Sequence, residues 1–175
     1  IMFPTEFGDH SKENFRHVLN LARKFGSDIT LFHAIARPIE SLFDLDTRPK
    51  VYNYKGQMLT LDQIIEHQID HQSQRAHRWI EWAAKEGITA TFRVDTSFQA
   101  IDKLILDQVD KENIDLIVME AQSGPMSAAL LGSFTRNVVR AAHCPTYILP
   151  RHFYDKGGER AQHINETRPD SNANL

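Results

Sequence analysis

The stretch from Ile114 to Pro150 carries the residues with the clearest chemical potential. It reads as a strand, a loop of small residues, a helix and a second strand, with Gly132 and Ser133 where the helix should begin. Backbone N–H groups at a helix start can converge on an anion, and the helix dipole favours negative charge there. Ser near a helix start is also an ordinary cap. The loop is therefore a candidate phosphate site, and both interpretations of the Gly-Ser pair stay open.

A carboxylate next to the same loop would repel a bound triphosphate. Glu120 directly follows the expected strand, and a carboxylate about 4 Å from a phosphate costs about 4 kcal/mol at an effective dielectric constant of 20. A bound Mg²⁺ would reverse the sign of this effect. Pro125 removes one backbone donor from the loop. We therefore expect weak nucleotide binding, with altered contacts between the loop and the phosphate groups.

Other reactive side chains have simpler interpretations. His67 and His71 are four residues apart on an expected helix, which is a permissible metal-ligand spacing, but their neighbours are polar and indicate a solvated face. Cys144 stands at the start of an expected core strand, where a buried thiol is usually inert. No Ser-His-Asp order, paired-carboxylate geometry or strong metal motif is present. We assign no catalytic residue and no metal ligand, and slow phosphohydrolysis at a nucleotide site is left as an alternative.

Alternating strands and helices must position these residues. Apolar runs predict five strands, at about residues 1–4, 28–35, 88–94, 114–119 and 146–150. Helices are expected from Ser11 to Gly26, from Leu61 to Lys85, after Ser97 and from Gly132, with Ser11 and Ser97 as caps. This order predicts a doubly wound α/β fold with a parallel sheet. Its carboxyl edge should gather residues 4–8, 33–38, 94–97 and 119–133, where ligands bind at the switch of strand order.

The apolar stripes of the helices predict which residues face the sheet. The first helix should bury Phe15, Val18, Leu19, Ala22 and Phe25, and the third Ile101, Leu104, Ile105 and Val109. The last helix should bury Phe134, Val138, Val139 and Ala142. Trp79 and Trp82 in the long helix are expected to pack against the sheet or the insertion that precedes the helix.

Length and composition place limits on the class of protein. The chain has 175 residues, a net charge of −3 and one cysteine. We expect one domain over residues 1–150, an irregular insertion at about 37–61 and a polar, flexible tail over 151–175. No basic stripe indicates nucleic acid, and no apolar run approaches the roughly 20 residues that span a membrane. A single cysteine suits a reducing compartment, so we expect a cytoplasmic protein.

Both ends of this domain resemble universal stress proteins. The stretch MFPTEFGDHSKENFRHVLNLARKFGSDITLFHAI is similar to the opening of that family, and DLIVM followed by LLGSFTRNVVRAAHCPTYIL is similar to its closing half. The resemblance implies a three-layer α/β/α fold with a five-stranded parallel sheet, of the Rossmann-like, adenine nucleotide alpha hydrolase-like type. It also implies a homodimer through the last strand, at Thr146, Tyr147, Ile148 and Leu149.

The family contains members that bind ATP and members that do not. ATP-binding members carry Gly-x2-Gly-x9-Gly-Ser/Thr after the fourth strand, and Gly132-Ser133 stands at the final Gly-Ser. The earlier glycines fall on Glu120 and Ser123 when counted from Met119, on Met119 and Gln122 when counted back from Gly132, and on Ala121 and Gly124 if two residues are deleted. No alignment restores the full pattern. The resemblance implies a nucleotide site at Pro4, Thr5, Glu6, Ala34, Met119, Glu120, Gly132, Ser133, Phe134 and Thr135.

Two functions follow as hypotheses. The first is a stress-response binding or regulatory module with an adenine-nucleotide site, for ATP or a related nucleotide, with or without Mg²⁺. The second is a homodimeric protein-interaction module that binds no nucleotide and has an unidentified protein partner. Aromatic residues of the insertion, Phe43, Tyr52 and Tyr54, fit either a lid over the carboxyl edge or a partner surface.

Overall fold

The computed structural model describes residues 1–35, 37, 50–121 and 132–149. Its helices are α1 (Asp9–Phe25), α2 (Leu61–Lys85), α3 (Ile101–Lys111) and α4 (Ser133–Ala141). Its strands are β1 (Met2–Pro4), β2 (Ile29–Ala34), β3 (Val51–Tyr54), β4 (Gln57–Thr60), β5 (Ala90–Asp95), β6 (Ile117–Glu120) and β7 (Thr146–Leu149). Within these ranges, no helix combines the length and the apolarity that crossing a bilayer would require.

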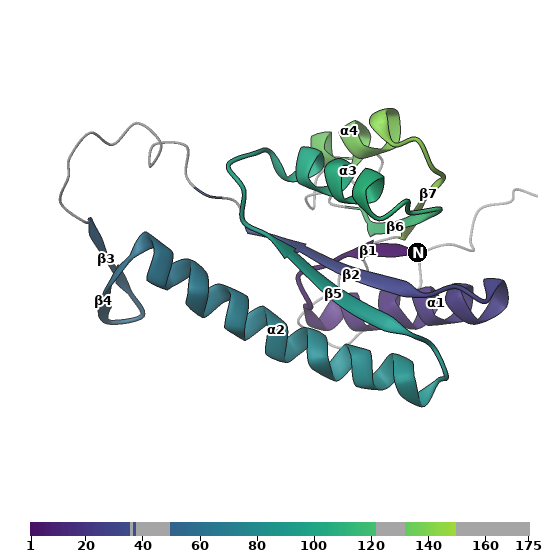
Figure 1. Cartoon of the computed structure of the whole chain (residues 1–175), viewed down its shortest axis with the longest axis horizontal. Coiled ribbons are helices and arrows are strands. Elements are labelled where there is room, and N and C mark those ends of the chain that lie inside the picture. The colour runs from purple at the N-terminus through teal and green to yellow at the C-terminus, as the bar shows by residue number, and fades with distance from the viewer. Residues whose placement is uncertain (36, 38–49, 122–131, 150–175) are drawn as a thin grey trace, which may run out of the picture.

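Five of the strands form one parallel sheet in the order β5-β2-β1-β6-β7. Helices α1 and α2 cover one face of this sheet, and α3 and α4 cover the other (Figure 1). The predicted three-layer α/β/α fold is thereby confirmed. The chain moves outward from β1 through β2 to β5, then returns to the other side of β1 for β6 and β7. The strand order therefore reverses between β1 and β6.

Each face of the sheet has its own apolar core, because successive strand residues point to opposite sides. Phe3 of β1 joins the core under α1 and α2, whereas its neighbour Met2 joins the core under α3 and α4. Trp79 of α2 stacks on Phe15 with ring centres 4.6 Å apart, and its ring lies 6.3 Å from that of Phe3. Trp79 thus packs against the sheet and α1. Packing against the sheet is the first of the two alternatives that the sequence predicts.

Three residues of the predicted buried faces are exposed instead. Phe25 is 63% exposed because α1 ends there, at Gly26 in the left-handed conformation, and the chain turns back into β2 at the amino edge of the sheet. Val139 is 43% exposed because it lies one position beyond the fully buried Val138, off the inner face of α4. Ile101 is 39% exposed at the start of α3, where it borders a cavity.

Two predicted helix caps are wrong, and a third helix has a cap that was not predicted. The N-cap of α1 is Gly8, and Ser11 lies inside the first turn with its side chain fully buried. The N-cap of α3 is Ala100, whereas the backbone N–H of Ser97 bonds to its neighbour Asp95 in the preceding turn. Helix α2 begins where the sequence predicts, after a reciprocal Thr60–Gln63 capping box.

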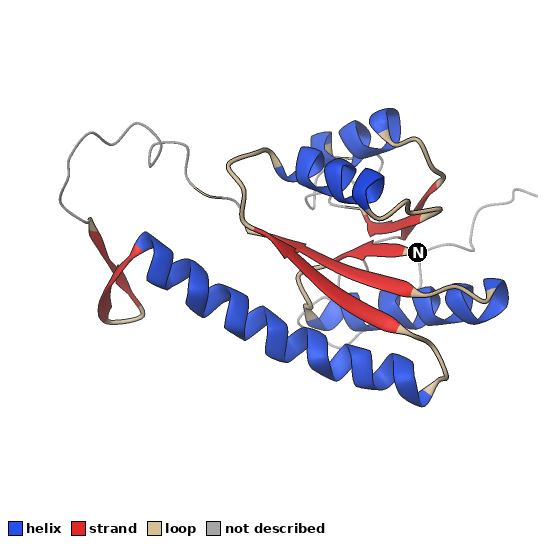
Figure 2. Cartoon of the chain, in the orientation of Figure 1, coloured by secondary structure: helices blue, strands red, loops and turns tan. Residues whose placement is uncertain are grey.

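The insertion expected to be irregular contains a β-hairpin. Strands β3 and β4 pair antiparallel just before α2 (Figure 2). Lys55 and Gly56 form the two-residue turn with φ angles of 51° and 86°. Positive φ at both positions is the geometry of a type I′ turn, whose twist matches that of the strands. The sequence signal for this hairpin is weak because Lys precedes the glycine where Asn or Asp is usual.

Two features considered in the sequence analysis, Phe43 of the insertion and the tail 151–175, lie outside the described residues.

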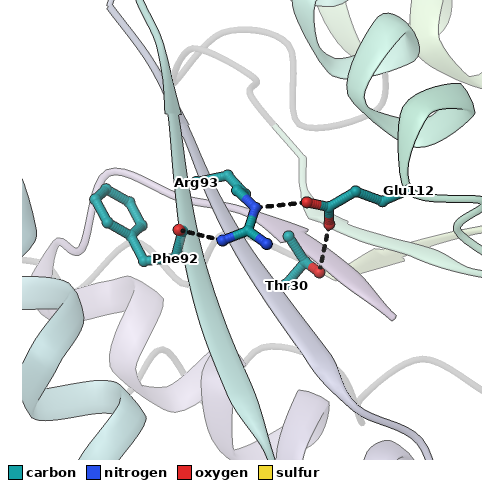
Figure 3. A network of polar contacts seen from close by, with 4 residues as sticks. All are labelled: Thr30, Phe92, Arg93 and Glu112. Carbon is teal, nitrogen blue, oxygen red and sulfur yellow. Dashed lines mark hydrogen bonds and ion pairs between the residues drawn. The ribbon is translucent and has the colours of Figure 1, made fainter.

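A polar network fixes the end of α3 above the sheet (Figure 3). The hydroxyl of Thr30 in β2 donates to Oε2 of Glu112, the C-cap of α3, over 3.0 Å. Nε of Arg93 in β5 donates to Oε1 of the same carboxylate over 2.6 Å. Because α3 is tied to two strands at its end, its opposite end is held over the carboxyl edge of the sheet.

Candidate functional site

A cavity of about 230 Å³ lies at the carboxyl edge of the sheet. The ends of β1, β2 and β6 form its floor, and α3 and the first turn of α4 form its wall. It is lined by Pro4, Thr5, Glu6, Phe32, His33, Ala34, Ile101, Ile105, Met119, Glu120 and Phe134. The strand order reverses beside β1, so the cavity occupies the position where ligands bind in doubly wound sheets.

The loop after β1 is held in place by three hydrogen bonds of Thr5. Its N–H donates to the carbonyl of Phe32 over 2.9 Å, and its hydroxyl oxygen accepts from the N–H of Phe7 over 3.0 Å. The Thr5 carbonyl lies 2.8 Å from Nδ1 of His33. Arg75 of α2 donates to the carbonyl of Phe7, whose φ of 55° turns the chain towards α1. The polar side of the cavity is therefore fixed before any ligand arrives.

The hydrogen bond to Thr5 also determines what His33 can offer. A carbonyl only accepts, so Nδ1 of His33 carries the proton in this contact. In the neutral ring, Nε2 is then left as an acceptor. The ring of Phe7 lies 6.4 Å from the imidazole, measured between ring centres. His33 is thus an oriented acceptor at the end of β2.

Glu120 links β6 to the first turns of α1. Its Oε2 accepts from the hydroxyl of Ser11 over 3.0 Å, and its Oε1 accepts from the side-chain amide of Asn14 over 2.9 Å. Ser11 and Asn14 are fully buried, so the carboxylate satisfies donors that would otherwise lose water contacts without compensation. The position near the start of α1 also suits a negative charge. Glu120 is therefore a structural anchor as well as a residue of the cavity wall.

The structure brings seven of the ten predicted site residues together: Pro4, Thr5, Glu6, Ala34, Met119, Glu120 and Phe134. Gly132, Ser133 and Thr135 do not line the cavity, although their neighbour Phe134 does. Gly132 is the N-cap of α4 and Ser133 is its first, exposed residue. The hydroxyl of Thr135 is buried and has no hydrogen-bond partner among the described residues. Two loop residues considered in the sequence analysis lie outside the described residues: Ser123, which stands at an earlier glycine of the family pattern, and Pro125.

Four residues of the cavity are not among the predicted site residues, although His33 lies in a range expected at the carboxyl edge: Phe32, His33, Ile101 and Ile105. The helical spacing of Ile101 and Ile105 predicts that both are buried in the core. The same spacing puts them on the first turns of a helix that begins at the carboxyl edge, where the inner face meets the cavity. For His33, the available signal was its position next to Ala34 at the end of a predicted strand, because strand ends meet at the carboxyl edge.

The remaining reactive side chains lie elsewhere. His67 and His71 are exposed on α2, beside a more open hollow of about 460 Å³ against the hairpin. Across the described ranges, no three His, Cys, Asp or Glu side chains are grouped as metal ligands. Cys144 precedes β7, and desolvation by burial raises the pKa of its thiol. A raised pKa lowers the thiolate fraction near neutral pH, which makes this thiol a poor nucleophile.

Comparisons with known proteins agree with this geometry. Residues 1–150 match the sequence model of the universal stress protein family. A universal stress protein UspA from Lactobacillus plantarum superposes with a TM-score of 0.63 at 17% identity, covering 85% of this chain and 95% of that one. A search of curated proteins found no match.

Two further solved structures contain a ligand. The universal stress protein of Archaeoglobus fulgidus in complex with dAMP has a TM-score of 0.56 at 16% identity and covers 84% of this chain and 94% of that one. A universal stress protein in complex with cAMP has a TM-score of 0.53 at 16% identity, with 86% and 95% covered. At these identities the likeness establishes the fold.

Proposed function

The chain belongs to the universal stress protein family, and we propose that it binds the adenosine part of an adenine nucleotide in the cavity beside β1. One observation carries this proposal. Residues from three separate strand ends and the start of α4, which the resemblance predicted as a nucleotide site, line one cavity at the switch of strand order. The complexes of two neighbours with dAMP and cAMP support an adenine ligand.

The composition of the cavity wall favours a nucleoside. Apolar side chains of α3 and α4, Ile101, Ile105 and Phe134, offer a surface for a purine ring. Thr5, from the loop after β1, and His33, from β2, also line the cavity, and their polar groups suit the hydroxyl groups of a ribose. The volume of about 230 Å³ is below the roughly 300–1,000 Å³ of pockets for drug-sized ligands, which favours a compact part of a nucleotide over a whole triphosphate.

Calorimetric titration with adenosine, AMP and ATP tests this proposal. Each ligand is added to the full chain with Mg²⁺ and again with excess EDTA. We expect saturable binding of at least one adenine ligand with a dissociation constant of about 1 mM or tighter. Guanosine is the control ligand, because it has the same ribose and a different purine edge. Absence of heat and of a thermal shift with all three adenine ligands, in both conditions, would contradict the proposal.

A second candidate function, a homodimeric interaction module, is favoured by the edge strand β7. This strand pairs only with β6 in the described sheet, and its Tyr147 is 50% exposed. An open strand with an exposed aromatic side chain is a typical pairing surface. We expect light scattering at micromolar concentration to give a dimer mass, and Tyr147→Lys to give a monomer. The matched control is Tyr52→Lys on the hairpin, where the tyrosine is 45% exposed. A monomeric unsubstituted chain would rule out this interface.

A further inference from the structure

We propose that the hollow between the β3–β4 hairpin and α2 is a second binding site, which takes an uncharged ligand with many hydroxyl groups, of the saccharide class. Among the described residues, its walls come from the hairpin and α2 alone. The hairpin and the first turns of α2 project beyond the five-stranded sheet (Figure 1). The site is therefore separate from the cavity beside β1, and this inference does not depend on nucleotide binding there.

The hairpin forms one wall of the hollow. Residues directly opposite each other in an antiparallel pair point to the same face, so the paired Tyr54 and Gln57 share one face of the hairpin, and both line the hollow. The N–H of Gly56 donates to Oδ1 of Asn53 over 3.0 Å, which closes the turn beside them. A capping box joins the other end of the hairpin to α2. This wall is therefore fixed before any ligand arrives.

Helix α2 forms the opposite wall. His67, His71 and Gln74 follow one another at helical spacing, and Gln68 and Gln72 form a second row beside them. All five line the hollow. The sequence alone indicates a solvated polar face at this position, because the partner across the hollow is a hairpin with a weak sequence signal. Placed opposite Tyr54 and Gln57, the same polar face becomes one side of a site.

Gln72 is the observation that points to a ligand. Its side-chain oxygen, Oε1, is buried and accepts no hydrogen bond from any described residue. A buried acceptor without a donor has lost its contacts with water and gained nothing in return, so such atoms are rare in folded proteins. Because Gln72 belongs to the wall of the hollow, a hydroxyl group of a bound ligand would supply the missing donor.

The composition of the walls determines the class of ligand. The described lining contains one ammonium group, from Lys55, and one carboxylate, from Asp70, so it has no excess of charge for an ionic ligand. The other lining residues are amides, imidazoles and one phenol. Amides and neutral imidazoles both donate and accept hydrogen bonds, as the hydroxyl groups of a sugar do.

The shape of the hollow agrees with this class. The Tyr54 ring is the one aromatic surface of the described lining, and such a surface suits the C–H face of a sugar ring. The volume of about 460 Å³ lies within the roughly 300–1,000 Å³ of small-molecule sites. It leaves room for one or two sugar rings.

A titration of the full ¹⁵N-labelled chain with glucose and with maltose tests this proposal. The side-chain amide signals of Gln68 and Gln72 are the direct readout. We expect saturable shifts of both signals, with a dissociation constant of about 1 mM or tighter for maltose. Glycerol at the same concentration is the control, because it reproduces the general effect of a polyol on the solvent. No shift with either sugar, or equal shifts with glycerol, would overturn the proposal.

Two variants assign the binding to the hollow. Gln72→Leu should weaken maltose binding at least about tenfold, and Gln57→Leu, on the exposed hairpin wall, about threefold. The Tm of Gln72→Leu should equal or exceed that of the unsubstituted chain, because leucine fills similar space and removes the unpaired acceptor. The matched control is Gln99→Leu, exposed in the turn before α3, which should change neither maltose affinity nor Tm.

The outcomes test the site and its premise separately. Unchanged maltose affinity in Gln72→Leu and Gln57→Leu would show that the sugar binds elsewhere. A lower Tm in Gln72→Leu would show that the amide is bonded within the fold, which contradicts the unpaired acceptor. Adenosine binding is followed at Thr5 and Ala34, whereas sugar binding is followed at the hollow, so the two proposals fail independently.

Discussion

Ala34→Phe should weaken adenosine binding about 100-fold, a loss of about 2.8 kcal/mol. Ala34 is the last residue of β2, and its methyl group lines the cavity. A benzyl group at this position would enter a space of about 230 Å³ and leave no room for a purine. The ring fills an existing cavity and displaces no packed side chain, so the free energy of unfolding should change by less than about 1 kcal/mol. Calorimetry measures the affinity, and chemical denaturation measures the stability.

The matched control for this substitution is Ala84→Phe. Ala84 is exposed near the end of α2, so the same added ring meets solvent there. Its effect on adenosine affinity should be less than twofold. Undiminished binding by a folded Ala34→Phe chain would show that the ligand binds outside this cavity.

Trp79→Ala should lower the free energy of unfolding by about 3–5 kcal/mol, the largest stability effect that we expect from one substitution. The indole is 9% exposed and stacks on the ring of Phe15, and the ring of Phe7 meets it edge-on with centres 5.1 Å apart. Its removal leaves a cavity between α2, α1 and the sheet, because the surrounding rings relax only in part. Denaturant unfolding followed by circular dichroism measures the loss.

Phe25→Ala is the control for the tryptophan variant. Phe25 belongs with Phe15 to the predicted buried face of α1, yet its side chain is 63% exposed. Its replacement should change stability by less than about 0.5 kcal/mol. Equal losses in the two variants would mean that the aromatic cluster under α1 and α2 does not carry the stability we assign to it.

The elements of the sheet could be predicted because each carries a strong local signal. The mostly apolar run at 114–119 requires cover on both faces, and the polar-apolar spacing of α2 predicts its limits at Leu61 and Lys85. The predicted cap at Ser97 is wrong because its backbone N–H bonds locally to the Asp95 side chain and α3 begins later, after Ala100. The predicted cap at Ser11 is wrong because a tertiary contact overrides the capping preference. Ser11 bonds to Glu120, more than 100 residues away in the chain, and no local pattern contains that partner.

The candidate site was predictable where a strand end defines it. Pro4, Ala34 and Met119 end or nearly end parallel strands, so topology alone brings them to one edge. The orientation of the Glu120 carboxylate was not predictable. From the sequence its charge is expected to oppose a phosphate, whereas the structure shows both carboxylate oxygens bonded to α1. Side-chain direction at a strand end depends on the neighbouring helix, which the spacing of residues does not reveal.

The central claim is that the strand ends around β1 form the binding site for an adenine ligand. A titration of ¹⁵N-labelled chain with adenosine, followed by amide chemical shifts, tests it most directly. We predict saturable shifts at Thr5, Ala34, Met119 and Phe134, with the amides of the β3–β4 hairpin unchanged. Shifts confined to the hairpin or to β7, or no shifts at millimolar adenosine, would contradict the claim.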